Sequence, residues 1–150
     1  MRVGRAVLAG ILGAFAYLGA QEVDRRIGNP RSNDLVLLGG LFASGQPQPA
    51  RGIIALLAHF GGGIAFALLY EGFARDRLPG PHWLRGILLL QLENASLWPL
   101  CYLINPVHPS VRRGDLASIV SPAYFVQQVW RHLALGAVLG VLLRPSAGRS

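Results

Sequence analysis

Two pairs of polar residues interrupt the long apolar stretches of this 150-residue sequence. Glu93 and Asn94 lie near the middle of the third long apolar stretch, and Arg131 and His132 lie in the fourth. An ionisable side chain is costly in the hydrocarbon core of a membrane and is kept there when it faces protein or water and has a partner. The positions of these residues therefore predict a specific polar site inside a membrane.

The two pairs are expected at similar depths. Consecutive membrane helices run in opposite directions, and each helical residue adds about 1.5 Å of rise. Counted in this way, Glu93 lies roughly 12 Å from one membrane surface and Arg131 roughly 14 Å from the other. In a hydrocarbon core about 30 Å thick, these levels are within reach of an arginine side chain. We therefore expect Glu93 and Arg131 to pair, with His132 or His59 hydrogen-bonded nearby.

Other polar side chains fall in the same or adjacent layers. Spacing of i, i+4 places Gln127 with Arg131, and Gln128 with His132, on two adjacent strips of one helix. The predicted intramembrane polar cluster has these members: His59, Gln91, Glu93, Asn94, Gln127, Gln128, Arg131 and His132.

Two interpretations of this cluster remain open. It can fix which helices pack together, because polar contacts between membrane helices are worth about 1 kcal/mol each. Alternatively, it can serve the passage of a proton, an ion or a small solute. We expect a membrane protein without enzymatic machinery, since the sequence contains no metal-ligand spacing, no nucleophile elbow and no phosphate-binding loop.

Two histidines suggest a further alternative, a haem-binding redox protein. His59 and His132 on different helices could act as axial ligands, and the three glycines at 61–63 would leave room for a porphyrin. A lone histidine on an apolar helix is more often simply hydrogen-bonded, and Glu93 is available as its partner. We therefore predict no resident metal or cofactor.

The composition supports membrane insertion. The chain is 52% apolar, only 14% charged, and has a mean hydropathy of +0.41. Its net charge of +7 comes from arginines, without any lysine, and these arginines lie at the ends of the apolar stretches. That distribution indicates contact with anionic lipid headgroups rather than nucleic acid. The single cysteine, Cys101, excludes an intrachain disulfide and a cysteine-based metal site.

The predicted fold class is all-α, an integral membrane bundle of four transmembrane helices in one domain. The spans are expected at about 3–21, 52–72, 84–104 and 122–143. A short interfacial or half-buried helix is expected at about 34–44, which is too short to cross a bilayer. The first stretch also resembles a cleavable signal peptide, but its apolar run continues past the small-residue site at 14–16.

Proline and glycine positions refine this outline. Pro99 lacks a backbone donor, so we expect regular helix to end soon after Trp98. Gly136 and Gly140 form a GxxxG motif, which lets helices approach closely either within the chain or between two copies.

Four spans place both termini on one side of the membrane. Positive-inside counting gives seven arginines on that side against six on the other, which favours cytoplasmic termini by one charge.

From about residue 59 onward, roughly two thirds of the chain carries a loose pattern of characteristic residues. The pattern consists of His59, Tyr70, Pro79, Trp83 with Gly86, the segment 98–107, and the residues Trp130 and His132 with their neighbour at 131. It resembles the YagU-type family of small bacterial multi-pass inner-membrane proteins. The resemblance implies a location in the bacterial inner membrane and a link to acid tolerance. The glutamate expected near the start of the last helix is replaced here by Gln127 or Gln128, and Arg131 has no clear counterpart.

The predicted partners follow from location and helix surface. They are the lipid bilayer and either a second copy of the chain or another membrane protein, but no nucleic acid. A further alternative function is therefore that of a structural subunit of a membrane complex.

Overall fold

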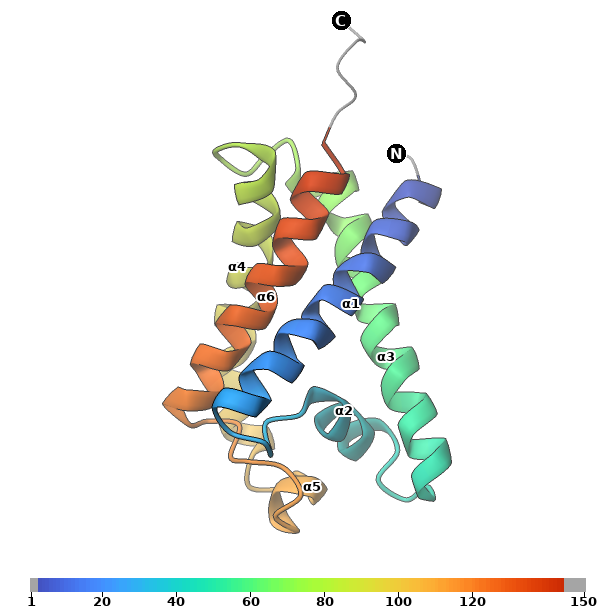
Figure 1. Ribbon diagram of the computed structural model, residues 1–150, viewed down its shortest axis with the longest axis vertical. Helices are drawn as coiled ribbons and strands as arrows, with labels where there is room; N and C mark the ends of the chain where they lie inside the picture. The colour runs from blue at the N-terminus through green and yellow to red at the C-terminus, as the bar shows by residue number, and fades with distance from the viewer. Residues whose placement is uncertain (1–2, 145–150) are drawn as a thin grey trace, which may run out of the picture.

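The computed structural model describes residues 3–144 and is built from helices, with no strand in that range. In chain order the elements are α1 (Val3–Ile27), α2 (Asp34–Phe42), α3 (Gln48–Leu69), the π-helical turn η1 (Tyr70–Ala74), α4 (His82–Ile104), α5 (Pro109–Arg112) and α6 (Pro122–Leu142) (Figure 1). Four helices are long and apolar enough to cross a membrane: α1, α3 together with η1, α4 and α6. The predicted all-α bundle with four helices of spanning length is confirmed.

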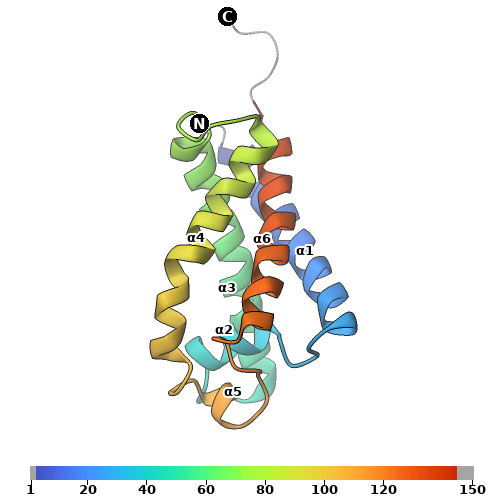
Figure 2. The same ribbon diagram turned by 90° about the vertical axis from the view of Figure 1, so that its left-hand side faces the viewer.

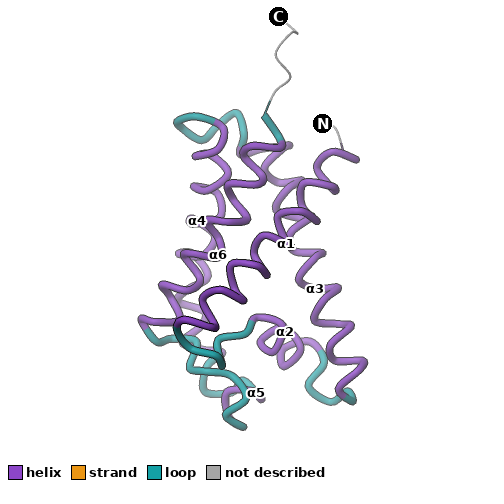
Figure 3. The backbone as a smooth tube through the Cα atoms, in the orientation of Figure 1, coloured by secondary structure: helices purple, strands orange, loops and turns teal. Residues whose placement is uncertain are grey.

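The four long helices alternate in direction, so α1 begins and α6 ends at the same end of the bundle (Figure 1). We call this the terminus end. The opposite end, the loop end, holds α2, α5 and most of the irregular chain (Figure 3). Helix α6 packs against both α1 and α4, whereas α3 packs against α1 and α2. The long helices α3 and α4 therefore pack mainly on other helices and come together through η1 (Figure 2).

Glycines allow the closest helix contacts. A Cβ atom added at Gly86 of α4 would collide with the backbone of Gly136 and Gly140 on α6. In the same way, Gly10 of α1 and Gly63 of α3 lie backbone to backbone, and a Cβ on either would come within 2.7 Å of the other's carbonyl oxygen. The predicted GxxxG motif thus packs within the chain, where small residues are needed for close approach.

Helix α2 is a short helix held at the loop end. Its first turn is capped by Asn33, whose side-chain oxygen accepts hydrogen bonds from the backbone N–H groups of Leu35 (3.0 Å) and Val36 (3.3 Å). From the side of α5, His108 Nε2 donates to the carbonyl oxygen of Leu37 at 3.0 Å, and Nδ1 accepts from the Ser110 N–H at 3.2 Å. Burial lowers the pKa of His108, and the charge of Arg113 lowers it further. His108 is therefore held in its neutral form.

Two helix boundaries differ from the prediction. Helix α1 continues to Ile27 rather than ending near residue 21, and its last turns carry buried polar groups. Helix α4 continues through Pro99 to Ile104, so the prediction that regular helix ends soon after Trp98 is wrong. A proline inside a helix removes one hydrogen bond and is accommodated by bending, and α4 changes direction part-way along its length in Figure 2. The Trp98 ring packs on Phe125 of α6 at a centroid distance of 4.7 Å, which anchors this part of α4.

Candidate functional site

Arg131 of α6 is the most deeply buried charged side chain of the described residues, with none of its surface exposed. Its Nε and Nη2 atoms donate to the two carboxylate oxygens of Asp24 at 2.7 and 2.6 Å. Its Nη1 atom donates to Asp34 Oδ2 at 3.0 Å and, more weakly, to Gln21 Oε1 at 3.4 Å. Nη2 also contacts the carbonyl and hydroxyl oxygens of Ser32, at 2.9 and 3.0 Å. All three guanidinium nitrogens therefore have acceptors.

Asp34, the first residue of α2, accepts hydrogen bonds on both carboxylate oxygens. Oδ1 accepts from the Tyr124 hydroxyl at 2.7 Å and from Gln128 Nε2 at 2.8 Å. Oδ2 accepts from Arg131 and from the Tyr17 hydroxyl. Burial opposes ionisation, but the charge of Arg131 and the hydrogen bonds from these neighbours lower the pKa of the Asp34 carboxyl. The side chain is thus an ionised carboxylate at the centre of a polar network.

Local sequence explains how these groups meet. Tyr17, Gln21 and Asp24 follow one another at spacings of four and three residues, so they share the buried face of α1. The chain then turns back at 28–33, and the cap at Asn33 directs the start of α2 into the bundle. We call the group formed by Asp24, Ser32, Asp34 and Arg131 the Arg131 cluster. It joins α1, α2 and α6, and its saturated hydrogen bonds give it a structural role in holding α2.

The predicted ion pair between Glu93 and Arg131 is wrong. Glu93 instead lies beside His132, with Oε2 3.0 Å from His132 Nε2. Consecutive residues on a helix point about 100° apart. When His132 faces α4, the side chain of Arg131 therefore points towards α1 and α2. The depth estimate located the right layer but did not assign the right faces.

His132 contacts both its own helix and α4. His132 Nδ1 lies 2.7 Å from the carbonyl oxygen of Gln128, which can only accept, so Nδ1 carries a hydrogen. Nε2 lies 3.0 Å from Glu93 Oε2, and the two groups form an ion pair when His132 is protonated.

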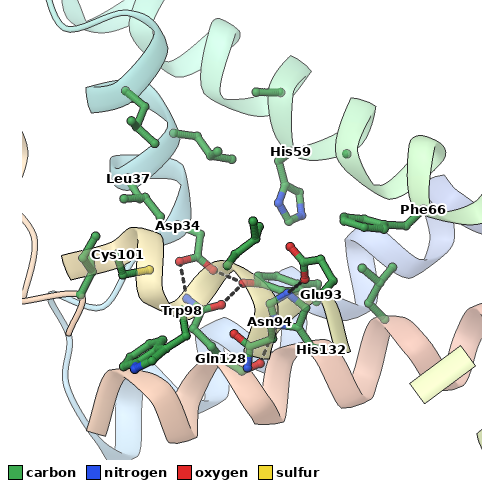
Figure 4. Close-up of a pocket in the computed structure, with 18 of the residues that line it drawn as sticks. Asp34, Leu37, His59, Phe66, Glu93, Asn94, Trp98, Cys101, Gln128 and His132 are labelled. Atoms are coloured by element: carbon green, nitrogen blue, oxygen red, sulfur yellow. Dashed lines mark hydrogen bonds and ion pairs between the residues drawn. The ribbon is translucent and has the colours of Figure 1, made fainter. Parts of the chain in front are cut away.

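A cavity of about 350 Å³ lies beside this pair, between α3 and α4, with α1 and α6 behind it and α2 at the loop end. Most of its wall is apolar, and its polar groups other than His59 gather at one side (Figure 4). Asn94 is only 7% exposed, and its Nδ2 atom has no hydrogen-bond partner among the described residues. Glu93 Oε2 is buried at ion-pair distance from His132 but lacks a hydrogen-bond partner in the same part of the chain. Unsatisfied buried polar atoms at a cavity wall indicate a place for a ligand or water.

His59 of α3 faces the same cavity from the opposite side (Figure 4). Its Nε2 atom donates to the carbonyl oxygen of Ala14 at 3.1 Å. The Tyr17 ring contacts both histidine rings, with centroid distances of 5.2 Å to His59 and 5.3 Å to His132. Two axial ligands of a haem need free ring nitrogens facing one iron. Here Tyr17 contacts both rings and both nitrogens of His132 are engaged, so these residues do not fit a haem.

The structure divides the predicted polar cluster into three parts. Gln127, Gln128 and Arg131 belong to the network around the two aspartates, where Gln127 Nε2 donates to Asp24 Oδ1 at 3.1 Å. His59, Glu93, Asn94 and His132 line the cavity, and Gln128 reaches it as well. Gln91 lies apart from both and donates from Nε2 to the carbonyl oxygen of Val129 at 3.0 Å, which joins α4 to α6.

Sequence reasoning missed the two aspartates and Tyr17. Asp34 was not among the predicted site residues; it is the first residue of α2, directly after the cap residue Asn33. Asp24 lies in the last turns of α1, beyond the predicted end of the span. A signal was present, since the small-residue face of α1 continues at helical spacing into Tyr17, Gln21 and Asp24.

The fold and the site together define the class of protein: a helical bundle of the multi-pass membrane type with buried polar networks. No protein-family model, curated protein or solved structure matches this chain. Function must therefore be argued from the site itself.

Proposed function

We propose that this membrane protein binds a small solute in its cavity, as a step in the passage of that solute. One observation carries the proposal: Asn94 Nδ2 and Glu93 Oε2 are buried without hydrogen-bond partners at the wall of a cavity of about 350 Å³. Ligand sites are typically largely apolar and of this size, with a few convergent polar groups. A cavity in a protein whose polar groups served only helix packing would lower the stability of the fold and have no function.

The route of entry follows from the helix arrangement. The cavity is bounded by α3 and α4, which pack mainly on other helices rather than on each other. A solute with an apolar body would thus enter from the bilayer between these helices. Leu37, Leu38 and Leu41 of α2 close the cavity towards the loop end. Passage to that end would require α2 to move, and the Arg131 cluster opposes this movement.

A second role, helix packing, applies to the Arg131 cluster itself. Its donors and acceptors are nearly all paired, which supports a structural function there rather than ligand binding. The resemblance to the YagU-type family adds the further proposal of a bacterial inner membrane with cytoplasmic termini. Association with a second copy or another membrane protein also stays a prediction.

Cys101 provides a direct test of solute binding, because this half-buried thiol lines the cavity and is the chain's single cysteine. The protein would be placed in lipid nanodiscs and treated with methyl methanethiosulfonate, a small neutral thiol reagent. We expect modification of Cys101, and we expect 1-adamantanol, a compact apolar alcohol, to slow it by occupying the cavity.

Two glycine variants serve as a matched pair. Gly62 lines the cavity and a Cβ there meets open space, so Gly62→Phe should fill the cavity and slow modification. Gly61 is exposed, also has open space at its Cβ, and does not line the cavity, so Gly61→Phe should leave the rate unchanged. If neither 1-adamantanol nor Gly62→Phe changes the rate, the cavity does not bind solutes and the proposal fails.

A further inference from the structure

The charges around the cavity do not balance. Two carboxylates, those of Asp24 and Asp34, face one guanidinium, that of Arg131. Glu93 lies instead beside His132, which balances it when protonated. The two aspartates with Arg131 therefore leave one negative charge uncompensated among buried side chains. Such a charge is strongly unfavourable unless a positive charge joins it.

We propose that the cavity binds a small organic cation, an ammonium group on an apolar body. This inference rests on the proposed solute binding and specifies the class of solute. Two of the three carboxylates, Asp34 and Glu93, line the cavity directly. Glu93 Oε2 is buried and free to accept a hydrogen bond from an ammonium group. His59, bonded through Nε2, has Nδ1 as a further possible acceptor.

The apolar wall determines the kind of cation. Phe66, Trp98 and Tyr17 line the cavity with leucines of α2 and α4. Aromatic faces attract cations, and they do so most strongly where water is excluded. A hydrated inorganic ion would lose its water without gaining enough oxygen ligands. Among residues 3–144 there is no group of three histidine, cysteine or carboxylate side chains placed to hold a metal ion.

The charge selectivity of Cys101 modification tests the inference. Three methanethiosulfonates would be compared in nanodiscs: the cationic 2-aminoethyl, the neutral methyl and the anionic 2-sulfonatoethyl reagents. Each rate would be divided by the rate of the same reagent with glutathione. We expect the corrected rate for the cationic reagent to exceed that for the anionic one by at least about tenfold, as in other clefts of one charge sign.

Variants identify the charges responsible. Glu93→Gln and Asp34→Asn should each lower the cationic preference severalfold, whereas Glu22→Gln, which removes an exposed carboxylate at the loop end, should not. If Asp34→Asn does not fold, Glu93→Gln decides alone. Equal corrected rates for the cationic and neutral reagents, or a preference that neither variant lowers, would overturn the inference while leaving solute binding intact. If none of the three reagents modifies Cys101, solute binding itself is contradicted.

Discussion

Asp24 and Asp34 both contact Arg131, but their replacement by asparagine should have different consequences. Each oxygen of Asp24 accepts from the guanidinium, at 2.7 and 2.6 Å. In Asp24→Asn, the new NH₂ group would face guanidinium N–H groups, and an arginine cannot accept a hydrogen bond. Breaking a buried ion pair from one side typically costs about 3–5 kcal/mol, so we expect a loss of that size.

Asp34 has more adaptable neighbours. Tyr17, Tyr124 and Gln128 can each accept as well as donate hydrogen bonds. In Asp34→Asn, the NH₂ group can donate to the Tyr17 oxygen, which then donates to Gln128 Oε1. Arg131 loses its single Nη1 contact with Asp34 but keeps its paired contact with Asp24. The loss should be near that of one hydrogen bond to a charged group, about 1.5–3 kcal/mol.

The comparison requires reversible unfolding in one detergent system. Sodium dodecyl sulfate titration in mixed micelles, followed by circular dichroism, would give the free energy of unfolding of each variant, with Glu22→Gln as a surface control. The reasoning predicts a clearly larger loss for Asp24→Asn. Equal losses, or a larger loss for Asp34→Asn, would show that the paired Asp24 contact does not dominate the Arg131 cluster.

Three further predictions concern helix contacts and pH. Gly86→Ala should destabilise the bundle by about 1–3 kcal/mol, since its Cβ meets the α6 backbone, whereas Gly61→Ala should not; the same unfolding titration measures both. Burial lowers the pKa of His108 below its ordinary value of 6.5, so the unfolded state takes up a proton first as pH falls. The contribution of neutral His108 to the free energy of unfolding should therefore be complete above about pH 6.5 and decline below it. His108→Asn should reduce this decline, which unfolding titrations at several pH values would measure. Gln91→Leu should cost about 0.6 kcal/mol through loss of its bond to the Val129 carbonyl, and a loss above about 2 kcal/mol would indicate a larger role.

The four long helices could be predicted because the length of each apolar stretch can be counted directly along the sequence. The start of α6 at Pro122 and the short α2 also followed from local signals, a proline in the first turn and the cap at Asn33. The course of α4 through Pro99 did not follow, because packing of Trp98 on Phe125 supports a helix that local propensity would end.

The polar partners could be predicted only in part. Helical rise gives depth, so the layer containing Glu93, Arg131 and His132 was located correctly. The choice of partner depends on the rotation of each helix about its own axis and on where the segment 28–33 folds back. The pattern of apolar residues specifies neither. Asp24 and Asp34 reach Arg131 only because that segment returns into the bundle, which is a property of tertiary structure.

Ligand-dependent stability tests the central claim, solute binding in the cavity, most directly. The unfolding midpoint of the nanodisc-embedded protein would be followed against increasing 1-adamantanol, for the unmodified chain, Gly62→Phe and Gly61→Phe. A ligand that binds the folded state alone stabilises it by an amount that grows with concentration, about 2.7 kcal/mol at a hundred times the dissociation constant. We predict that the midpoint rises with ligand concentration for the unmodified chain and for Gly61→Phe. For Gly62→Phe, we predict an unchanged midpoint. An unchanged midpoint in the unmodified chain, or an equal rise in Gly62→Phe, would contradict binding in the cavity.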